Sequence, residues 1–323
     1  FARGQGVSLD AVRIKETPKG EYLCIVKEEE GLPTRELLER MLPDFIAHIP
    51  FPKSMRWGSL SISFARPIHW IVALLGEEVL DFSYGEIPSG NQSLGHRFMS
   101  PQWLTVRDYA THLEQLKKHF VYADTAERKE LVRRGIEAAA QRVGGRILED
   151  EELLDEVTQL VEYPHPIVGE FETKYLDLPP ELLITVIKKH QRYFAVTDQD
   201  GKLMQYFVTV ANTVPRDDAM VAAGNARVVR ARLEDARFYY VEDQKVRLED
   251  RAEQLKGVVF HSKMGTSWEK MERFSALARW IGQKLAPETL PIISRAALLC
   301  KADLLSGVVG EFPELQGVMG RAY

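Results

Sequence analysis

Arginine is the most prominent side chain in the stretch GNARVVRARLEDARFYYVEDQK, residues 224–245. Four guanidiniums recur there: Arg227, Arg230, Arg232 and Arg237. A guanidinium is a planar fork of donors that reaches two phosphate oxygens at once, so a row of them on a helix is suited to bind phosphate. The alternative is a solvated face with local ion pairs, for which Arg230–Glu234 and Arg232–Asp235 have the right spacing.

The same stretch predicts an amphipathic helix that positions these arginines. Gly224 and Asn225 resemble a turn and a helix start, because Asn caps the free N–H groups of a first turn. After them, apolar residues recur at helical spacing and form one buried face: Val229, Leu233, Ala236 and Tyr240.

A second basic cluster is expected where a helix that starts at Pro179 and Pro180 ends. Lys188–Phe194 interleaves basic groups, His190 and Arg192 among them, with aromatic rings. Such a pattern holds phosphates and stacks bases. The alternative is structural, because a helix C-terminus attracts cations through its dipole.

The tetrapeptide GHRF, residues 95–98, is a further candidate. Its glycine lets the backbone approach a partner, and His96 and Arg97 follow, which suits a loop that faces a nucleic acid. It suits a structural turn equally well.

The remaining patterns predict mixed helices and strands. Residues 60–99 are typical of short strands, and residues 105–162 are typical of helices, one of them capped at Asp124. The sequence DQDGK, between YFAVTD and LMQYFVTVAN, predicts a β-hairpin. From residue 255 onward the pattern is helical again.

The net charge, the hydrophobic runs and the motif content of the sequence exclude several classes of function. The 323 residues carry a net charge of −5, so contact with a polyanion must come from local patches. No apolar run approaches a membrane span and no signal peptide is visible, so we expect a cytoplasmic protein without membrane contact. Phosphate-loop, dinucleotide-binding, zinc-protease and nucleophile-elbow motifs are absent from the sequence, and we expect no catalytic site.

One near-motif pairs His261 with Asp303 on a later predicted helix. A metal-dependent His–Asp hydrolase needs a histidine directly before that aspartate, but Ala302 stands there and removes one imidazole ligand. We therefore predict no metal and interpret His261 and Asp303 as a degenerate site, joined at most by a structural hydrogen bond.

Six segments in one order carry a resemblance to a known family: MRWG (55–58), FARPIHW (64–70), GHRF (95–98), QRYF (191–194), GNARVVRARLEDARFYY (224–240) and GEFPELQGVMGRAY (310–323). Together they resemble the beta subunit of bacterial heterotetrameric glycyl-tRNA synthetase. Because the chain opens without methionine and stops in a helical pattern, we interpret it as an internal fragment. By the resemblance it lacks the N-terminal start and the C-terminal anticodon-binding domain.

The resemblance implies a multi-domain α+β fold. Residues 1–50 would be a partial N-terminal segment. Residues 51–257 would form a mixed-sheet region similar to the editing-type domain of phenylalanyl-tRNA synthetase beta, with a helical excursion at 106–162. Residues 258–323 would begin an all-helical His–Asp-like domain.

The resemblance also implies a non-catalytic subunit of glycine–tRNA ligase that binds glycine tRNA and assembles with the alpha subunit as an alpha2-beta2 heterotetramer. ATP and Mg would act on the alpha subunit, with no cofactor in this chain. The arginines named above would then contact tRNA. Two alternatives stay open: a hydrolase or tRNA-editing enzyme that uses His261 and Asp303 or a pocket in the α+β region, and a structural scaffold without RNA contact.

Overall fold

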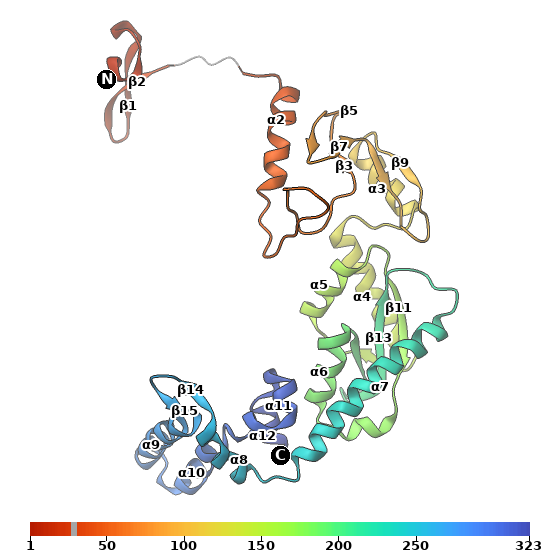
Figure 1. Ribbon diagram of the computed structural model, residues 1–323, viewed down its shortest axis with the longest axis vertical. Helices are drawn as coiled ribbons and strands as arrows, with labels where there is room; N and C mark the ends of the chain where they lie inside the picture. The colour runs from red at the N-terminus through yellow and green to blue at the C-terminus, as the bar shows by residue number, and fades with distance from the viewer. Residues whose placement is uncertain (27–30) are drawn as a thin grey trace. The chain divides into compact units, whose positions relative to one another are not determined.

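The computed structural model describes residues 1–26 and 31–323, so part of the expected segment 1–50 lies outside it. Helices and strands alternate along the chain, which confirms the mixed α+β class (Figure 1). The chain divides into two compact units, Phe1–Ser93 with Trp103–His112 and Leu94–Gln102 with Leu113–Tyr323. The domain limits expected at residues 51 and 258 stay predictions, because compact units and family domains are different divisions of the chain.

The first unit is built from short elements. Helix α1 (Ala2–Gln5) and the antiparallel pair β1 (Val12–Thr17) and β2 (Gly20–Ile25) come first, and helix α2 (Thr34–Ala47) follows. The strands expected within residues 60–99 are confirmed as short ones: β3 (Ile71–Val72), β4 (Leu74–Leu75), β5 (Glu78–Val79), β6 (Ser83–Tyr84), β7 (Ile87–Gly90) and β8 (Gln92–Leu94), with β9 (Trp103–Thr105) beyond them. Strand β7 pairs with β3 in parallel and with β6 in antiparallel fashion.

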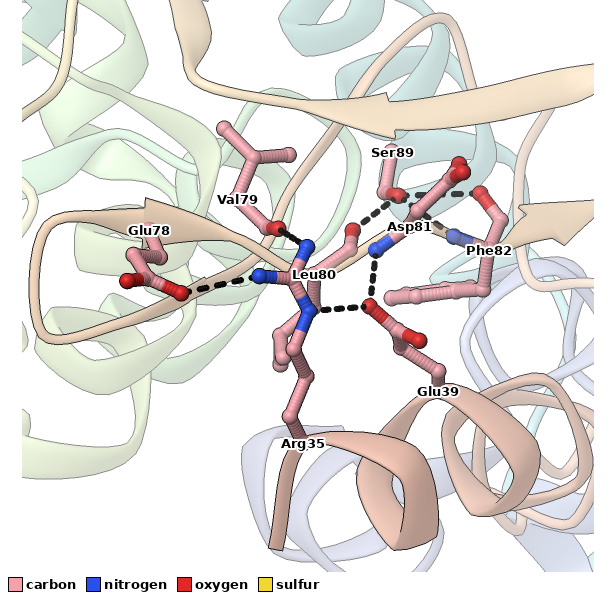
Figure 2. Close-up of polar contacts among 8 residues, drawn as sticks. All are labelled: Arg35, Glu39, Glu78, Val79, Leu80, Asp81, Phe82 and Ser89. Carbon is pink, nitrogen blue, oxygen red and sulfur yellow. Dashed lines mark hydrogen bonds and ion pairs between the residues drawn. The ribbon is translucent and has the colours of Figure 1, made fainter. Parts of the chain in front are cut away.

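Polar contacts fix α2 against strand β5 (Figure 2). The guanidinium of Arg35 donates to the carboxylate of Glu78 at 2.8 Å and to the carbonyl of Val79 at 3.1 Å. Glu39, one turn further along α2, accepts from the amide of Asp81 at 2.9 Å. That amide and Arg35 hold the pKa of the Glu39 carboxyl below its usual value.

The second unit is centred on an antiparallel sheet whose strands lie in the order β10, β12, β13, β11. Their bounds are β10 (Arg146–Ile147), β11 (His165–Glu170), β12 (Phe194–Thr197) and β13 (Leu203–Ala211). The hairpin predicted at DQDGK is confirmed between β12 and β13, and Gly201 in its turn has φ +82°. A positive φ is strained for other residues, which explains a glycine there.

Helices cover both faces of this sheet (Figure 1). Val208 belongs to the core beneath α4 (Thr125–Gln141) and α5 (Glu151–Leu160), and the neighbouring Phe207 belongs to the core beneath α6 (Pro180–Gln191) and α7 (Asp218–Asp243). Successive strand side chains point to opposite faces, so β13 alternates between the two cores. Gly169 on β11 is required by Phe207, because a Cβ atom there would lie 2.1 Å from its ring.

The predicted cap of α4 is confirmed, since the Asp124 side chain accepts from the amide of Glu127 at 2.8 Å. Helix α3 (Tyr109–Lys118) precedes α4. The predicted start of α7 at Gly224 and Asn225 is wrong. Asp217, in extended conformation, accepts from the first-turn amides and caps the helix there, so both residues lie in its interior.

The C-terminal part contains α8 (Leu248–Gln254), α9 (Ser267–Leu285), α10 (Leu290–Leu299), α11 (Gly307–Glu311) and α12 (Val318–Ala322). The expectation of an all-helical region from residue 258 is wrong in one respect, because β14 (Val259–His261) and β15 (Gly265–Thr266) form an antiparallel pair. Val308 and Met319 belong to the same core as α6 and α7. No helix among the described residues is long and apolar enough to cross a membrane.

Candidate nucleic-acid interface

Helix α7 buries the predicted apolar face and exposes its arginines. Val229, Leu233 and Ala236 are buried, and Tyr240 packs against the same core. The arginines predicted to contact phosphate are all exposed: Arg227, Arg230, Arg232 and Arg237. At 3.6 residues per turn they do not share one face, since Arg230 and Arg237 lie on one flank of the buried stripe and Arg232 lies on the other.

The local ion pairs expected within α7 do not form among the described residues. Glu234 instead accepts from Lys174 at 2.5 Å and from the hydroxyl of Tyr175 at 2.6 Å. Lys174 and Tyr175 hold the pKa of the Glu234 carboxyl below its usual value. Arg230 pairs at 2.8 Å with Glu172, which precedes Lys174 in the chain. The charge of Arg230 is therefore partly neutralised.

The other three arginines of α7 remain available for a ligand. Arg227, Arg232 and Arg237 form no ion pair with any acidic side chain that the structure describes. An exposed guanidinium keeps its full charge and all of its donors for phosphate oxygens. The phosphate interpretation therefore applies best to Arg227 and Arg237, because Arg232 lies on the same helical stripe as the carboxylate of Asp235.

The His96 side chain is a structural element. It is 1% exposed, and its Nδ1 accepts from the amides of Phe98 and Met99 at 3.3 and 3.2 Å. Nε2 then carries the proton and donates to the carbonyl of Asn212 at 2.6 Å. This favours the structural-turn alternative for GHRF, although the adjacent Arg97 is exposed.

The cluster at the end of α6 also separates into two kinds of residue. Arg192 adopts a left-handed conformation, φ 57°, that ends the helix, and its guanidinium pairs with Glu156. His190 is exposed, with its ring centroid 5.7 Å from that of Phe312. Of the two, His190 keeps its polar atoms free of hydrogen bonds to other described residues.

The structure brings His190 and Arg232 together although they are far apart in the sequence. Both line a hollow of about 250 Å³ with Asp235, Tyr239 and Glu311. Sequence reasoning missed these last three as site residues. The sequence could have indicated Asp235 and Tyr239, because they lie three and seven residues after Arg232 and therefore on the same side of a helix. No sequence pattern indicated Glu311, because it belongs to α11, a helix much later in the chain.

His261 and Asp303 do not form a pair. His261 is exposed on β14, and its Nδ1 accepts from the amide of Lys263 at 3.2 Å. Asp303 is 1% exposed, and its Oδ2 accepts from the amides of Gly317 and Gly320 at 2.5 and 3.0 Å. The expected hydrogen bond between His261 and Asp303 does not form, because the Asp303 carboxylate accepts from amides at the start of α12 instead. In the described part of the chain, no group of three or more metal-binding side chains is placed to hold an ion.

Comparison with known proteins identifies the class as a subunit of an aminoacyl-tRNA synthetase. The family profile described as glycyl-tRNA synthetase beta subunit matches residues 1–323. Curated glycine–tRNA ligase beta subunits from Trichlorobacter lovleyi and Geobacter metallireducens are 54% and 53% identical to the chain over 323 residues. The chain belongs to the glycyl-tRNA synthetase beta subunit family, as its motifs predicted. It spans 47% of the length of these two relatives.

Proposed function

We propose that this chain is the part of a glycine–tRNA ligase beta subunit that contacts glycine tRNA and supports the attachment of glycine on an alpha subunit. The observation that carries the proposal is the family match over all 323 residues, with relatives named as beta subunits of that ligase. ATP and Mg²⁺ would then act on the alpha subunit, in an alpha2-beta2 assembly within the cytoplasm.

The finer fold assignment is part of the same proposal. Residues 51–257 would correspond to the editing-type domain of phenylalanyl-tRNA synthetase beta, and residues 258–323 to a degenerate His–Asp-like domain. A hydrolase that pairs His261 with Asp303 gains no support, because each side chain has other partners. The alternative of a structural scaffold without RNA contact also gains no support, because the unpaired arginines suit an RNA contact.

We assign the phosphate contact to two unpaired arginines of α7, Arg227 and Arg237. The chain as a whole is negative, so a phosphate backbone is attracted only where positive charge is locally uncompensated. Arg227 and Arg237 meet that condition on the exposed side of the helix. Each phosphate contact releases condensed counterions, which makes affinity fall with salt.

The test is the salt dependence of tRNA binding by the full chain, with Arg227→Ala and Arg237→Ala as variants. We expect each variant to weaken binding to all RNAs and to lower the slope of log affinity against log salt by about one. The matched control is Arg134→Ala, an exposed arginine of α4 that pairs with Glu130 at 2.5 Å. A slope unchanged in both α7 variants would contradict the assignment of RNA contact to this helix.

A further inference from the structure

The hollow beside α7 has polar groups that no other part of the described chain uses. The side chains of His190, Arg232, Asp235 and Glu311 line it, and none of these four side chains forms a hydrogen bond or ion pair with another described residue. Even Arg232 and Asp235, three residues apart, do not pair. Polar side chains that converge on one concave site and keep their hydrogen-bonding capacity are the mark of a ligand site.

The charges in this hollow disfavour phosphate. One guanidinium, that of Arg232, faces two carboxylates, those of Asp235 and Glu311. The neighbouring Lys189 adds little, because it pairs with Glu314 at 2.8 Å. Two carboxylates repel a phosphate, but they accept hydrogen bonds from neutral N–H groups. The occupant should therefore present several N–H donors beside an acceptor.

Aromatic surfaces also line the hollow. Tyr239 contributes an exposed ring, and the exposed His190 ring lies edge-on to the buried Phe312 at an interplanar angle of 70°. Gly307 allows the Tyr239 ring to pack closely, since a Cβ atom at Gly307 would lie 2.8 Å from it. Rings of this kind stack on unpaired nucleobases, and single-stranded bases offer their edges for hydrogen bonds.

The volume limits the ligand to a single ring system. About 250 Å³ is less than the roughly 300–1,000 Å³ typical of pockets for drug-sized molecules. Among the RNA bases, guanine carries the most N–H donors, at N1 and N2, next to the acceptors O6 and N7. Carboxylates accept hydrogen bonds from the N1 and N2 donors, and arginine is the usual donor to O6 and N7.

We propose that the hollow formed by His190, Arg232, Asp235, Tyr239, Glu311 and Phe312 binds one unstacked guanine base of an RNA. The inference rests on the proposed RNA-binding function and deepens it, because it adds base recognition to phosphate contact. Arg227 and Arg237 position the RNA strand, while the carboxylates beside Arg232 read the base.

The experiment measures binding of the full chain to single-stranded oligouridylates that carry one central guanosine, inosine or adenosine. We expect a preference of roughly fivefold or more for guanosine over adenosine. Inosine, which lacks the 2-amino donors, should fall between them. Asp235→Asn and Glu311→Gln should each reduce the preference, because an amide presents N–H groups to the N–H edge of guanine.

The matched control is Glu242→Gln, a carboxylate of α7 that pairs with Lys245 and lies outside the hollow. It should keep the preference, and unfolding midpoints of all variants should stay close to that of the parent chain. Equal, salt-sensitive binding of the guanosine and adenosine oligomers would overturn the guanine site and leave the phosphate surface intact. Absence of binding to any oligomer and to tRNA would overturn both proposals.

Discussion

Asp243, at the end of α7, is a buried carboxylate with donors from several segments. Its Oδ1 accepts from Arg251 at 2.9 Å and from the amide of Gly307 at 2.7 Å. Its Oδ2 accepts from the amide of Val308 at 2.9 Å and from the hydroxyl of Tyr323 at 2.7 Å. Burial and the nearby carboxylate raise the pKa of Tyr323, so its phenol stays protonated and keeps donating. This one side chain therefore joins α7, α8 and α11 to residue 323.

We expect Asp243→Ala to lower the free energy of unfolding by about 3–5 kcal/mol, because the variant leaves the Arg251 guanidinium buried without its counter-charge. Urea unfolding followed by circular dichroism measures the change. Asp250→Ala, an exposed aspartate of α8, is the control and should stay within about 0.5 kcal/mol of the parent. A cost for Asp243→Ala no larger than that of the control would show that these hydrogen bonds contribute little.

The identity and exposure of the α7 arginines could be predicted from the sequence, but their electrostatic state could not. Helical periodicity depends on neighbours within a few residues. The partners that distinguish Arg230 from Arg237, and Arg192 from His190, come from other elements, namely Glu172 and Glu156. Partner choice across elements follows from tertiary packing, which no local pattern contains.

At the scale of elements, local signals succeeded where they had no competitor. Asp124 and the Pro179–Pro180 pair start helices as predicted. The prediction for the start of α7 was wrong because two local signals competed, namely Asp217 and the Gly224–Asn225 pair. The Asp217 side chain caps two amides, so the helix begins at Asp218, upstream of the Gly224–Asn225 pair. Helix propensity is a weak term that such context overrides.

A substitution at Gly224 tests whether this residue lies in the interior of α7. We expect Gly224→Ala to raise the free energy of unfolding by roughly 0.5–1 kcal/mol, because alanine loses less backbone entropy in a helix. No atom lies within 4 Å of the added Cβ, so the change costs no packing. Thermal unfolding measures it, with Gly144→Ala as the contrasting variant, which should destabilise because Gly144 has φ +76°. Destabilisation by Gly224→Ala would restore a turn at that residue.

For the whole molecule, the sequence could predict the α+β class and family but not the compact units. The second unit contains residues on both sides of the expected limit at 258, because Val308 and Met319 share a core with Leu182 and Leu233. Motif order and helical periodicity describe segments one after another. They carry no information on which distant segments bury surface against each other, and the limit at 258 came from the family resemblance.

A shared core predicts shared unfolding. Met319 and Leu182 are both fully buried in it, and truncating either to alanine should cost about 2–5 kcal/mol. Hydrogen exchange measures where the loss appears: we expect Met319→Ala to accelerate exchange in α6 and β13 as strongly as Leu182→Ala does. Met264→Ala, at a methionine that is 53% exposed, should leave these amides unchanged. Faster exchange confined to residues after 258 in Met319→Ala would mean that the C-terminal part unfolds by itself, and the limit expected from the sequence would then mark a true domain boundary.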